Sequence, residues 1–562
     1  MQVSALSQTA LVYDALSYCW EGSVRSSSIC INGHSFAITE SLHQALHSIG
    51  TDELFWVDQI CIDQDNNTEK SEQVALMTRI YSGCRICFCY LGPEDDDTYS
   101  ALIQASYFHS LHNDWPFLYK APFELPIDLS RVEGLQPLDV DKQALYRLLG
   151  RPYFRRRWVF QEVVVSRWSI GICGRYDFPM LPLLHARLEQ VKHLMEQGQL
   201  YRAKITSVME ANPFAMLTIN KAWREKISGS DIAASGDTSL AHLLDLTTGS
   251  ESGDQRDTFY ALLGIASDRD AFPQPDYSIS AVDVLFIFTI ALIDEGYGWL
   301  CLCRAWRNHC AGLPSWVPAW WTWGTSAVVK GPASIFSRAL SSNDHSPNLT
   351  RTTAFSIDST EGNLRVRCTS LEKIAAVARI TVDDNNDLLL AKSRLLAGYC
   401  LKYTDSSVCK DDLPFLKVVA SLIMSLSHQD ASVDNLALLL SNVLGSSDPS
   451  TVGVFPSDGS ESTSVDSIAL LASCRRVFEG MKIVMTETHR LCWAPIETRI
   501  NDVAAVIEDA PNAVILRPHG LQTYEYIGLA SLEEASSMEV RSYAGPTSQL
   551  PSAGGPQTIT LV

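Results

Sequence analysis

The stretch of residues 54–92 constrains the fold of this chain more than any other. It begins with the apolar run LFWVDQI and ends with a second one, RICFCYLG, and both are typical of buried strands. Between them lie a polar loop and a helix, which we expect Thr68 to cap and Gly83 to end, with Val74, Met77 and Tyr81 on its buried face. Two strands joined by one crossover helix form a βαβ unit, so the sequence predicts parallel pairing between residues 54–60 and 85–91.

Polar side chains follow both predicted strands. Asp58 and Gln64 lie at or just past the end of the first strand, and Glu94 follows the second. Ligands bind outside the carboxyl ends of the strands in open parallel sheets, so these residues are candidates for a binding site. The alternative is structural, because Asp58 and Gln64 could instead satisfy loop amides and cap helices. The spacing leaves both interpretations open.

The composition excludes some classes of protein. The formal net charge of −20 argues against nonspecific binding to nucleic acid or to anionic membranes. The N-terminus has no signal-peptide pattern, and the apolar run at residues 284–293 is too short to span a bilayer, so it is expected to be a buried helix. The 15 cysteines lie mostly inside apolar runs, which suits buried thiols in a reducing compartment. We therefore expect a cytoplasmic protein without a membrane span.

Two clusters of side chains have competing interpretations. The first could hold a metal, but its spacing matches no familiar zinc pattern, so no metal site is predicted. It consists of Cys301, Cys303, His309 and Cys310. The second could be a stacking platform for a ring, or a proline-bent strap packed on helices. It consists of Trp316, Trp320, Trp321 and Trp323.

The chain divides into three predicted regions. Residues 1–175 form an α/β domain, with a hairpin or strand pair that turns at Asn32-Gly33 and an insertion or lid at about residues 94–150. Residues 176–340 form a mainly helical region. Residues 341–562 form a mixed α+β region that ends in a small β-rich domain of short strands, with a Ser/Asp/Gly-rich loop, expected to be mobile, at about residues 446–467.

The segment RRRWVFQEVVV stands out for its charges. Three arginines, Arg155–Arg157, precede Trp158, which opens a predicted helix. Glu162 is the only carboxylate in this strongly apolar segment, and it is either exposed on one helix face or buried and functional. The arginines could pair with it or hold a phosphate.

Several blocks together resemble the fungal heterokaryon-incompatibility (HET) domain. In order they are YDALSYCWEG, FWVDQICIDQ, EKSEQVALMTRIYSGC, YLG and RRRWVFQEV. The likeness is strong over residues 11–175 and fair to about residue 323, where RDTFYALLGIASD, PDYSIS and LPSWVPAWW resemble segments that follow the domain in long family members. Three positions depart from the family pattern: Glu21 interrupts the usual WG, Asp63 replaces the asparagine of CINQ, and Ala319 replaces an acidic residue. The first two lie near the predicted site and would alter its activity.

HET domains are thought to be relatives of TIR domains, so the resemblance implies a TIR-like, flavodoxin-like open sheet at the N-terminus. A TIR domain opens with a strand of the type YDxFLS, here Tyr13–Ser17, and carries a helix that begins WCxxE, here Trp158 to Glu162. In enzymatic TIR domains that glutamate is the catalytic residue for the cleavage of NAD. The resemblance therefore implies Glu162 as a catalytic residue that stabilises an oxocarbenium-like ribosyl transition state.

The same hypothesis places Glu162 at the mouth of a pocket. Its expected substrate-binding residues are Tyr18, Trp20, Asp58, Gln64, Arg157 and Trp158. A tryptophan would stack on a planar ring, and the fork of Arg157 would hold a phosphate. In the alternative interpretation Trp158 belongs to the core, and Glu162 accepts backbone hydrogen bonds from the loop after Leu91.

Three function classes remain open. The first is an effector of nonself recognition and regulated cell death that cleaves NAD or a related nucleotide. The second is a noncatalytic signalling module that acts through protein partners or self-association. The third is an enzyme that acts on another small molecule and has borrowed the HET scaffold. No cofactor is expected, because NAD would enter as the substrate.

Overall fold

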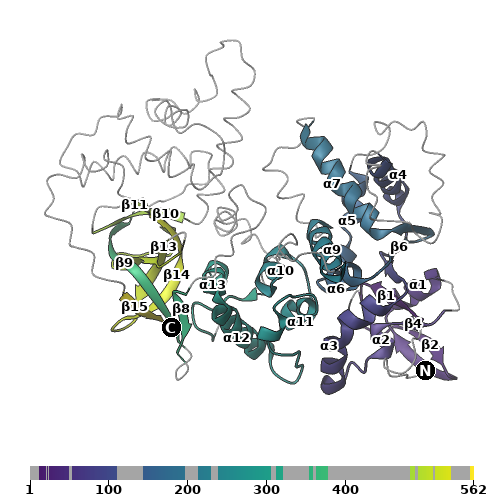
Figure 1. Cartoon of the computed structure of the whole chain (residues 1–562), viewed down its shortest axis with the longest axis horizontal. Coiled ribbons are helices and arrows are strands. Elements are labelled where there is room, and N and C mark those ends of the chain that lie inside the picture. Colours follow the sequence, from purple (N-terminus) through teal and green to yellow (C-terminus); the bar gives the residue numbers. More distant parts are fainter. Residues whose placement is uncertain are drawn as a thin grey trace, which may run out of the picture. The chain divides into compact units, whose positions relative to one another are not determined.

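The computed structural model forms two compact units, Met1–Val284 and Leu285–Val562, and the boundary between them falls inside helix α12 (Ala281–Leu292) (Figure 1). The described residues are 12–20, 22, 24–49, 53–110, 143–196, 213–228, 238–247, 249–305, 310, 312–320, 353–358, 363–377, 481–487, 491–510, 513–532 and 557–562. The loop expected to be mobile at about residues 446–467 and much of the predicted insertion lie outside them. The three-region division stays a prediction.

The first unit is built on a five-stranded sheet in the order β4-β1-β5-β6-β7. Its strands are β1 (Asp14–Tyr18), β4 (Phe55–Trp56), β5 (Cys87–Tyr90), β6 (Ser169–Cys173) and β7 (Tyr176–Pro179). The first four run parallel to their neighbours, and β7 pairs antiparallel with β6 at one edge. The predicted open α/β sheet is therefore present.

The predicted direct pairing of residues 54–60 with 85–91 is wrong, because β1 lies between β4 and β5 and pairs with both. The first strand is also shorter than predicted. It stops at Trp56, and Asp58–Cys61 form the short helix α2. The Asp58 carboxylate accepts a hydrogen bond from the backbone N–H of Gln59 at 2.7 Å. Such local bonds compete with strand pairing, which explains why the extended run ends early.

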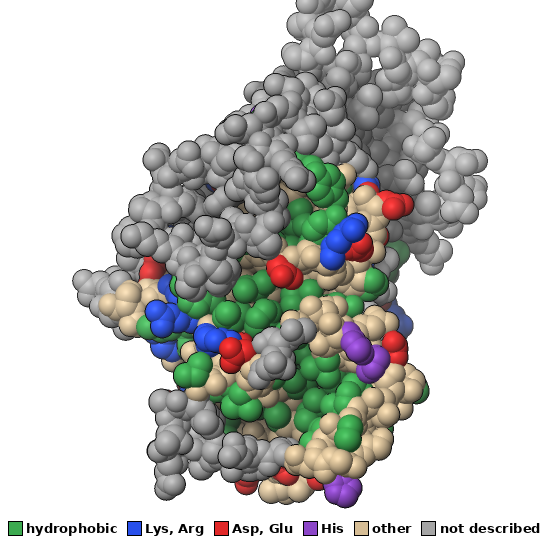
Figure 2. Space-filling view, turned by 90° about the vertical axis from the view of Figure 1, so that its right-hand side faces the viewer, with side chains coloured by type: hydrophobic (Ala, Val, Ile, Leu, Met, Phe, Trp, Pro, Cys, Tyr) green, Lys and Arg blue, Asp and Glu red, His purple; other side chains and the backbone are tan. Residues whose placement is uncertain are grey.

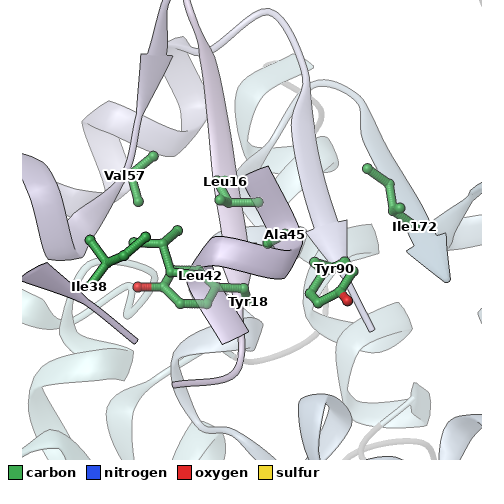
Figure 3. Packing of buried hydrophobic residues seen from close by; sticks show 8 residues of the cluster. All are labelled: Leu16, Tyr18, Ile38, Leu42, Ala45, Val57, Tyr90 and Ile172. Atoms are coloured by element: carbon green, nitrogen blue, oxygen red, sulfur yellow. The ribbon is translucent and has the colours of Figure 1, made fainter. Parts of the chain in front are cut away.

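A hairpin and a helix cover one face of the sheet. The strands β2 (Ser27–Ile31) and β3 (His34–Ile38) pair antiparallel across a predicted turn in which Asn32 and Gly33 both have positive φ, 51° and 83°. Helix α1 (Glu40–Ile49) follows, with Thr39 Oγ1 accepting from the backbone N–H of Leu42. The hydrophobic core on this face is shown in Figure 3 and consists of Leu16, Tyr18, Ile38, Leu42, Ala45, Val57, Tyr90 and Ile172.

The opposite face is packed by α3 (Asn67–Gly83) and α6 (Trp158–Val165), which also contact each other. Helix α3 ends at Gly83 as predicted, but its cap is not Thr68. Instead, Asn66 Oδ1 accepts from the backbone N–H groups of Thr68 and Glu69 at 3.1 and 3.2 Å. Thr68 therefore lies inside the first turn, where its own N–H needs an acceptor.

The remaining helices of the first unit flank the sheet or follow it. They are α4 (Asp96–Ser110), α5 (Ala144–Leu149), the 3-10 helix η3 (Pro152–Arg155), α7 (Met180–Glu196), α9 (Pro213–Ser228), α10 (Leu240–Leu246), α11 (Asp257–Leu263) and the 3-10 helix η5 (Arg269–Ala271).

Helix α11 is joined to α6 by a buried polar contact. At its first residue, Asp257 accepts hydrogen bonds from Trp158 Nε1, at 2.9 Å, and from the Tyr277 hydroxyl. Just past its end, a Cβ atom on Gly264 would lie 1.7 Å from Thr78 Oγ1 and 2.2 Å from Gln161 Nε2. The glycine therefore lets the end of α11 pack directly on α3 and α6.

The second unit contains a sheet that closes on itself. The ring runs β10-β11-β14-β13-β12-β9 and returns to β10, while β15 pairs with β9 and β14 and β8 pairs with β9. The strands are β8 (Phe355–Ile357), β9 (Leu364–Val377), β10 (Met481–Thr486), β11 (Leu491–Pro495), β12 (Val503–Ile507), β13 (Ala513–Pro518), β14 (Thr523–Leu532) and β15 (Gln557–Leu561). This is the predicted β-rich C-terminal domain.

The helical part of the second unit follows α12. A π-helical turn η6 (Ile293–Tyr297) and α13 (Gly298–Ala305) continue it, with a kink at Gly296, whose φ is 90°. Together Ala281–Ala305 are long and apolar enough to cross a membrane by length and composition, and 61% of the most apolar window is buried inside the structure. The predicted burial of the apolar run is confirmed at Leu285, Phe288 and Leu292.

The tryptophan-rich segment is a strap. Trp316 and Trp320 are 0% and 5% exposed, and Trp320 Nε1 donates to Thr289 Oγ1 at 3.1 Å. The stacking-platform hypothesis is therefore wrong for these two, while Trp321 and Trp323 lie outside the described residues.

We expect Met77→Ala to lower the free energy of unfolding by about 2–5 kcal/mol, because the Met77 side chain lies on the buried face of α3 and is only 4% exposed. Arg79→Ala is the matched control, since Arg79 is exposed on the same helix and its replacement should change stability by less than about 0.5 kcal/mol. Chemical denaturation measures both. Equal effects of the two substitutions would show that the burial of this helix face is wrongly assigned.

The stability of the first unit should also depend on the protonation of Asp257. Burial raises the pKa of Asp257 to about 6, against the opposing effect of the Tyr277 and Trp158 hydrogen bonds; Asp254 and Lys70 also face it. In the folded state Asp257 therefore keeps a proton that it loses at about pH 4 in the unfolded chain. The protonated carboxyl group stabilises the folded state fully below about pH 4. This contribution is lost as the pH rises through about 6.

Asp257→Asn removes this titration. The melting temperature of the wild type, measured relative to this variant, should fall as the pH is raised from about 4 to about 7. The corresponding loss in free energy of unfolding is about 3 kcal/mol for a pKa shift of about two units. Calorimetry over this pH range measures it. Asp270→Asn is the control, because that side chain is fully exposed. A pH-independent difference between wild type and Asp257→Asn would contradict the prediction.

Candidate functional site

A group of polar side chains meets where the carboxyl ends of β1 and β4 approach the start of α6. We call it the Glu162 cluster, and its members are Ser17, Tyr18, Asp58, Tyr153, Arg156 and Glu162. Strand β1 supplies the first two, and the short helix α2 supplies Asp58. The cluster thus lies at the sheet edge where ligands bind in open parallel sheets.

Glu162 lies in the second turn of α6 and is 2% exposed. Its carboxylate accepts a hydrogen bond from Ser17 Oγ, and Ser17 Oγ lies 2.7 Å from the Tyr153 hydroxyl. Successive side chains of a strand point to opposite faces, so Ser17 faces α6 whereas its neighbours Leu16 and Tyr18 belong to the core on the α1 side. This alternation gives Glu162 a buried polar partner within an apolar layer.

Arg156 provides the positive charge of the cluster. Its Nη1 lies 3.5 Å from Glu162 Oε2, and its side chain is 17% exposed. Among the described residues, Nη1 has no hydrogen bond of ordinary geometry. Arg156 is therefore an ionic partner of Glu162 that still has a donor available.

Asp58 is the second carboxylate. It accepts hydrogen bonds from Trp20 Nε1 at 3.0 Å and from the N–H of Gln59, while Gln64 Nε2 donates to the backbone oxygen of Asp58 at 3.1 Å. Trp20 and Gln64 thus converge on the residue that begins α2. The bonding of Gln64 matches the structural alternative for that side chain.

Burial dominates the electrostatics of both acids. It raises the pKa of Glu162, against the opposing effects of Arg156 and of the Ser17 hydrogen bond, and the charge of Asp58 raises the pKa of Glu162 further. Burial likewise raises the pKa of Asp58, again opposed by Arg156. With both acids ionised, one guanidinium would face two carboxylates. The cluster would then carry one excess negative charge, which favours retention of a proton.

Tyr18 adds a buried hydroxyl beside Asp58, and its side chain is 1% exposed. Burial raises the pKa of Tyr18, and the nearby Asp58 carboxylate raises it further. The hydroxyl therefore stays neutral and faces Asp58 as a donor.

The three consecutive arginines have different surroundings. The backbone of residues 155–157 pairs with Glu251: Arg157 N donates to Glu251 O at 2.9 Å, and Glu251 N donates to Arg155 O at 2.6 Å. Only Arg156 has an extended backbone, because Arg155 ends the 3-10 helix η3 and Arg157 has helical φ and ψ. The Arg155 side chain is exposed, whereas that of Arg156 reaches Glu162.

Arg157 points away from Glu162. It is 3% exposed and donates to Thr247 Oγ1 at 2.9 Å and to Ser250 O at 3.1 Å. Burial lowers the pKa of Arg157 to about 10. Trp158, the other predicted contact on this side, donates to Asp257. The structure therefore brings Tyr18, Trp20, Asp58 and Gln64 towards Glu162, but not Arg157 or Trp158.

Sequence reasoning missed two members of the cluster, Ser17 and Tyr153, and it named Arg156 only as one of three arginines that could pair with Glu162. The alternation of β1 could have identified Ser17, but no sequence signal separates Arg156 from the arginines beside it. The predicted alternative, in which Glu162 holds the loop after Leu91, is not what the contacts show. Arg151 holds that loop, with Nη1 donating to Leu91 O and Pro93 O at 3.1 and 2.8 Å.

In the described part of the chain, no group of three or more His, Cys, Asp or Glu side chains is placed to hold a metal ion. Cys301 and Cys303 are buried in α13, and His309 lies outside the described residues. The chemistry that the Glu162 cluster can perform is that of two carboxylates and a guanidinium. It can stabilise a developing positive charge, and it can transfer a proton.

Comparison with known proteins identifies the region that holds this cluster. Residues 13–162 match the family model "Heterokaryon incompatibility protein (HET)". The chain is 26% identical over 376 residues to heterokaryon incompatibility protein 6, OR allele, of Neurospora crassa, and the alignment covers 55% of this chain and 53% of that protein. The chain therefore spans about half the length of that relative. No solved structure matches the chain.

The matched region begins at Tyr13, one residue before β1, and ends at Glu162 itself. It contains every member of the Glu162 cluster, together with Trp20 and Gln64. The blocks that first suggested the family are those that build the central strands, helix α3 and the start of α6. The chain accordingly contains a heterokaryon incompatibility (HET) domain at residues 13–162.

Proposed function

We propose that this protein acts in heterokaryon incompatibility, as an effector of nonself recognition and regulated cell death. Its HET domain would cleave the N-glycosidic bond of NAD or a related nucleotide, with Glu162 as the catalytic residue. The biological role is supported by the domain and by the name of the Neurospora relative. The chemistry is supported by one observation above all, a buried carboxylate beside a guanidinium at the carboxyl edge of the sheet.

The strand order supports a TIR-like origin for this chemistry. With the separate β2–β3 hairpin set aside, the five strands of the sheet follow the order 2-1-3-4-5, which is that of flavodoxin-like sheets. The antiparallel β7 departs from the all-parallel form of that fold. In such sheets the ligand lies at the switch point beside the first strand, and Ser17 lies on that strand.

The proposed reaction begins when the bond between the ribose C1′ and the nicotinamide nitrogen breaks. The bonding electrons leave with nicotinamide, and positive charge develops over C1′ and the ring oxygen. The Glu162 carboxylate stabilises this charge, and it does so most effectively where water is excluded. Water then attacks C1′, so the products are nicotinamide, ADP-ribose and a proton.

The contacts of Glu162 suit this role. Ser17 and Arg156 fix its carboxylate on two sides, and Tyr153 in turn fixes Ser17. A carboxylate held in this way needs no reorganisation when charge develops. The planar guanidinium of Arg156, beside Glu162, is suited to a phosphate or hydroxyl oxygen of the substrate.

Substrate entry requires the site to open. Glu162 is 2% exposed, whereas Trp20 is only half-buried and bonds Asp58 beside it. In this proposal Trp20 leaves Asp58 and exposes the cluster, and its ring then stacks on a planar ring of the nucleotide.

A second candidate is a noncatalytic module that acts through protein partners or self-association. Two observations favour it. Arg156 pairs with the buried Glu162 carboxylate, as in a purely structural ion pair. In addition, hydrophobic side chains predominate among the described residues of the face in Figure 2, which is typical of surfaces that bind other proteins.

Glu162→Gln separates the two candidates. Gln keeps the shape and an acceptor for Ser17 but removes the charge, so nicotinamide release from NAD should fall by roughly 10²–10³-fold. Liquid chromatography of the purified full-length protein incubated with NAD measures it. Glu72→Gln is the matched control, because it makes the same exchange on an exposed face of α3 and should leave the rate unchanged.

A wild-type protein that consumes no NAD would overturn the proposed chemistry and favour the noncatalytic module. NAD consumption that is equal in wild type and Glu162→Gln would instead show that cleavage occurs without this carboxylate. Thermal unfolding of both variants checks that each one is folded.

The pH dependence of the reaction should depend on Arg156. Glu162 acts ionised, so the rate should fall as the pH drops through the pKa of Glu162, which burial raises. Arg156 opposes that shift, so Arg156→Gln should raise the pKa further and move the acid limb of the kcat/KM profile to higher pH. Arg155→Gln, in which the neighbouring exposed arginine is replaced, should leave the limb in place. An unmoved limb in Arg156→Gln would show that Arg156 does not set the charge of the catalytic group.

A further inference from the structure

The family match ends at Glu162, yet the start of α6 is held from outside the matched region. Helix α6 has only eight residues, and its N-cap, Arg157, makes no side-chain capping hydrogen bond. A helix this short is marginal on its own, and its geometry therefore depends on tertiary contacts. The position of Glu162 thus rests on whatever fixes the first turn of α6.

Residues 247–277 make three contacts with that first turn. Glu251 pairs with the backbone of Arg155 and Arg157, and so it fixes the chain on both sides of Arg156, whose side chain reaches Glu162. The guanidinium of Arg157 is buried against Thr247 and Ser250.

The third contact is the buried carboxylate of Asp257. It accepts from Trp158 Nε1 and from the Tyr277 hydroxyl, and the Tyr277 backbone N–H donates to Ser71 Oγ at 2.9 Å. Asp257 therefore joins the first residue of α6 to a tyrosine that is itself anchored on α3.

We propose that Asp257 is a positioning residue of the Glu162 site: through Trp158 it fixes the first turn of α6 and thereby holds Glu162 against Ser17 and Arg156. Trp158 and Glu162 are four residues apart, so they lie one turn apart on the same side of the helix. A shift of the first turn is consequently transmitted to Glu162. The catalytic part of this inference rests on the proposed function, whereas the structural coupling does not.

The remaining charged groups around Asp257 act on its surroundings and not on Glu162. Lys70 and Arg256 lie over the Tyr277 ring at 4.1 and 4.9 Å, and Arg256 also pairs with Asp254 at 2.7 Å. They hold the tyrosine in place beside Asp257. No other residue in the described segments 238–247 and 249–280 hydrogen-bonds the Trp158 side chain in the structure.

The first test does not need activity. Asp257→Asn, Glu162→Gln and the double variant are compared in thermal unfolding of the full-length protein. Asp257 and Glu162 have no shared hydrogen-bond partner, so independent sites would give additive shifts in melting temperature. The proposal predicts that the double variant departs from the sum. Asp270→Asn, combined with Glu162→Gln, is the matched control and should be additive.

The second test uses NAD cleavage. Trp158→Phe keeps an aromatic ring but removes the indole N–H that donates to Asp257, so it should lower kcat by about 10–100-fold, as a small misplacement of a catalytic group does, with little change in KM. Asp257→Asn should lower kcat to the same extent, and the variant that carries both substitutions should have a kcat no lower than either single variant. Both single variants should also move the acid limb of the pH profile to higher pH, because Arg156 then lies farther from Glu162. A simple loss of folded protein would leave the acid limb in place.

The two tests separate the possible failures. Additive melting shifts, or a Trp158→Phe variant with unchanged kcat and pH profile, would overturn the positioning role. A protein that never cleaves NAD but shows nonadditive melting shifts would overturn the proposed function and leave the positioning role standing.

Discussion

The contact between Glu162 and Arg156 is the interaction on which the rest of the site depends. Burial of a carboxylate is costly unless a charge partner and hydrogen bonds compensate it, and here Arg156 and Ser17 do so. Loss of one partner from such a buried pair costs about 3–5 kcal/mol. The same contact favours the ionised carboxylate that the proposed chemistry needs, because Arg156 opposes the rise in the pKa of Glu162 that burial causes.

The chain builds this contact from segments far apart in sequence. Strand β1 supplies Ser17 on the face opposite its core residues, and the early end of β4 places Asp58 at the start of a helix instead of inside a strand. Residues beyond the matched domain then complete the site, because Glu251 aligns the arginine segment and Asp257 holds the first turn of α6. The working unit of this HET domain protein therefore extends past residue 162 into the segment that ends near Tyr277.

Sequence reasoning predicted the parts of this structure that follow local rules. The hairpin turn at Asn32-Gly33, the buried face of α3 and the burial of residues along α12 all follow from backbone preference or periodicity. Such local rules do not say which strands lie side by side in the sheet. The sequence therefore did not show that β1 lies between β4 and β5. Likewise, the choice of Arg157 over Arg156 failed, since the direction of each side chain is set by the distant Glu251.

An experimental structure of the protein with ADP-ribose bound tests the account most directly. The account predicts that Trp20 has left Asp58, that the ribose C1′ faces the Glu162 carboxylate, and that Arg156 contacts an oxygen of the ligand. A structure in which ADP-ribose is bound elsewhere, while Glu162 keeps its closed contacts with Ser17 and Arg156, would contradict it.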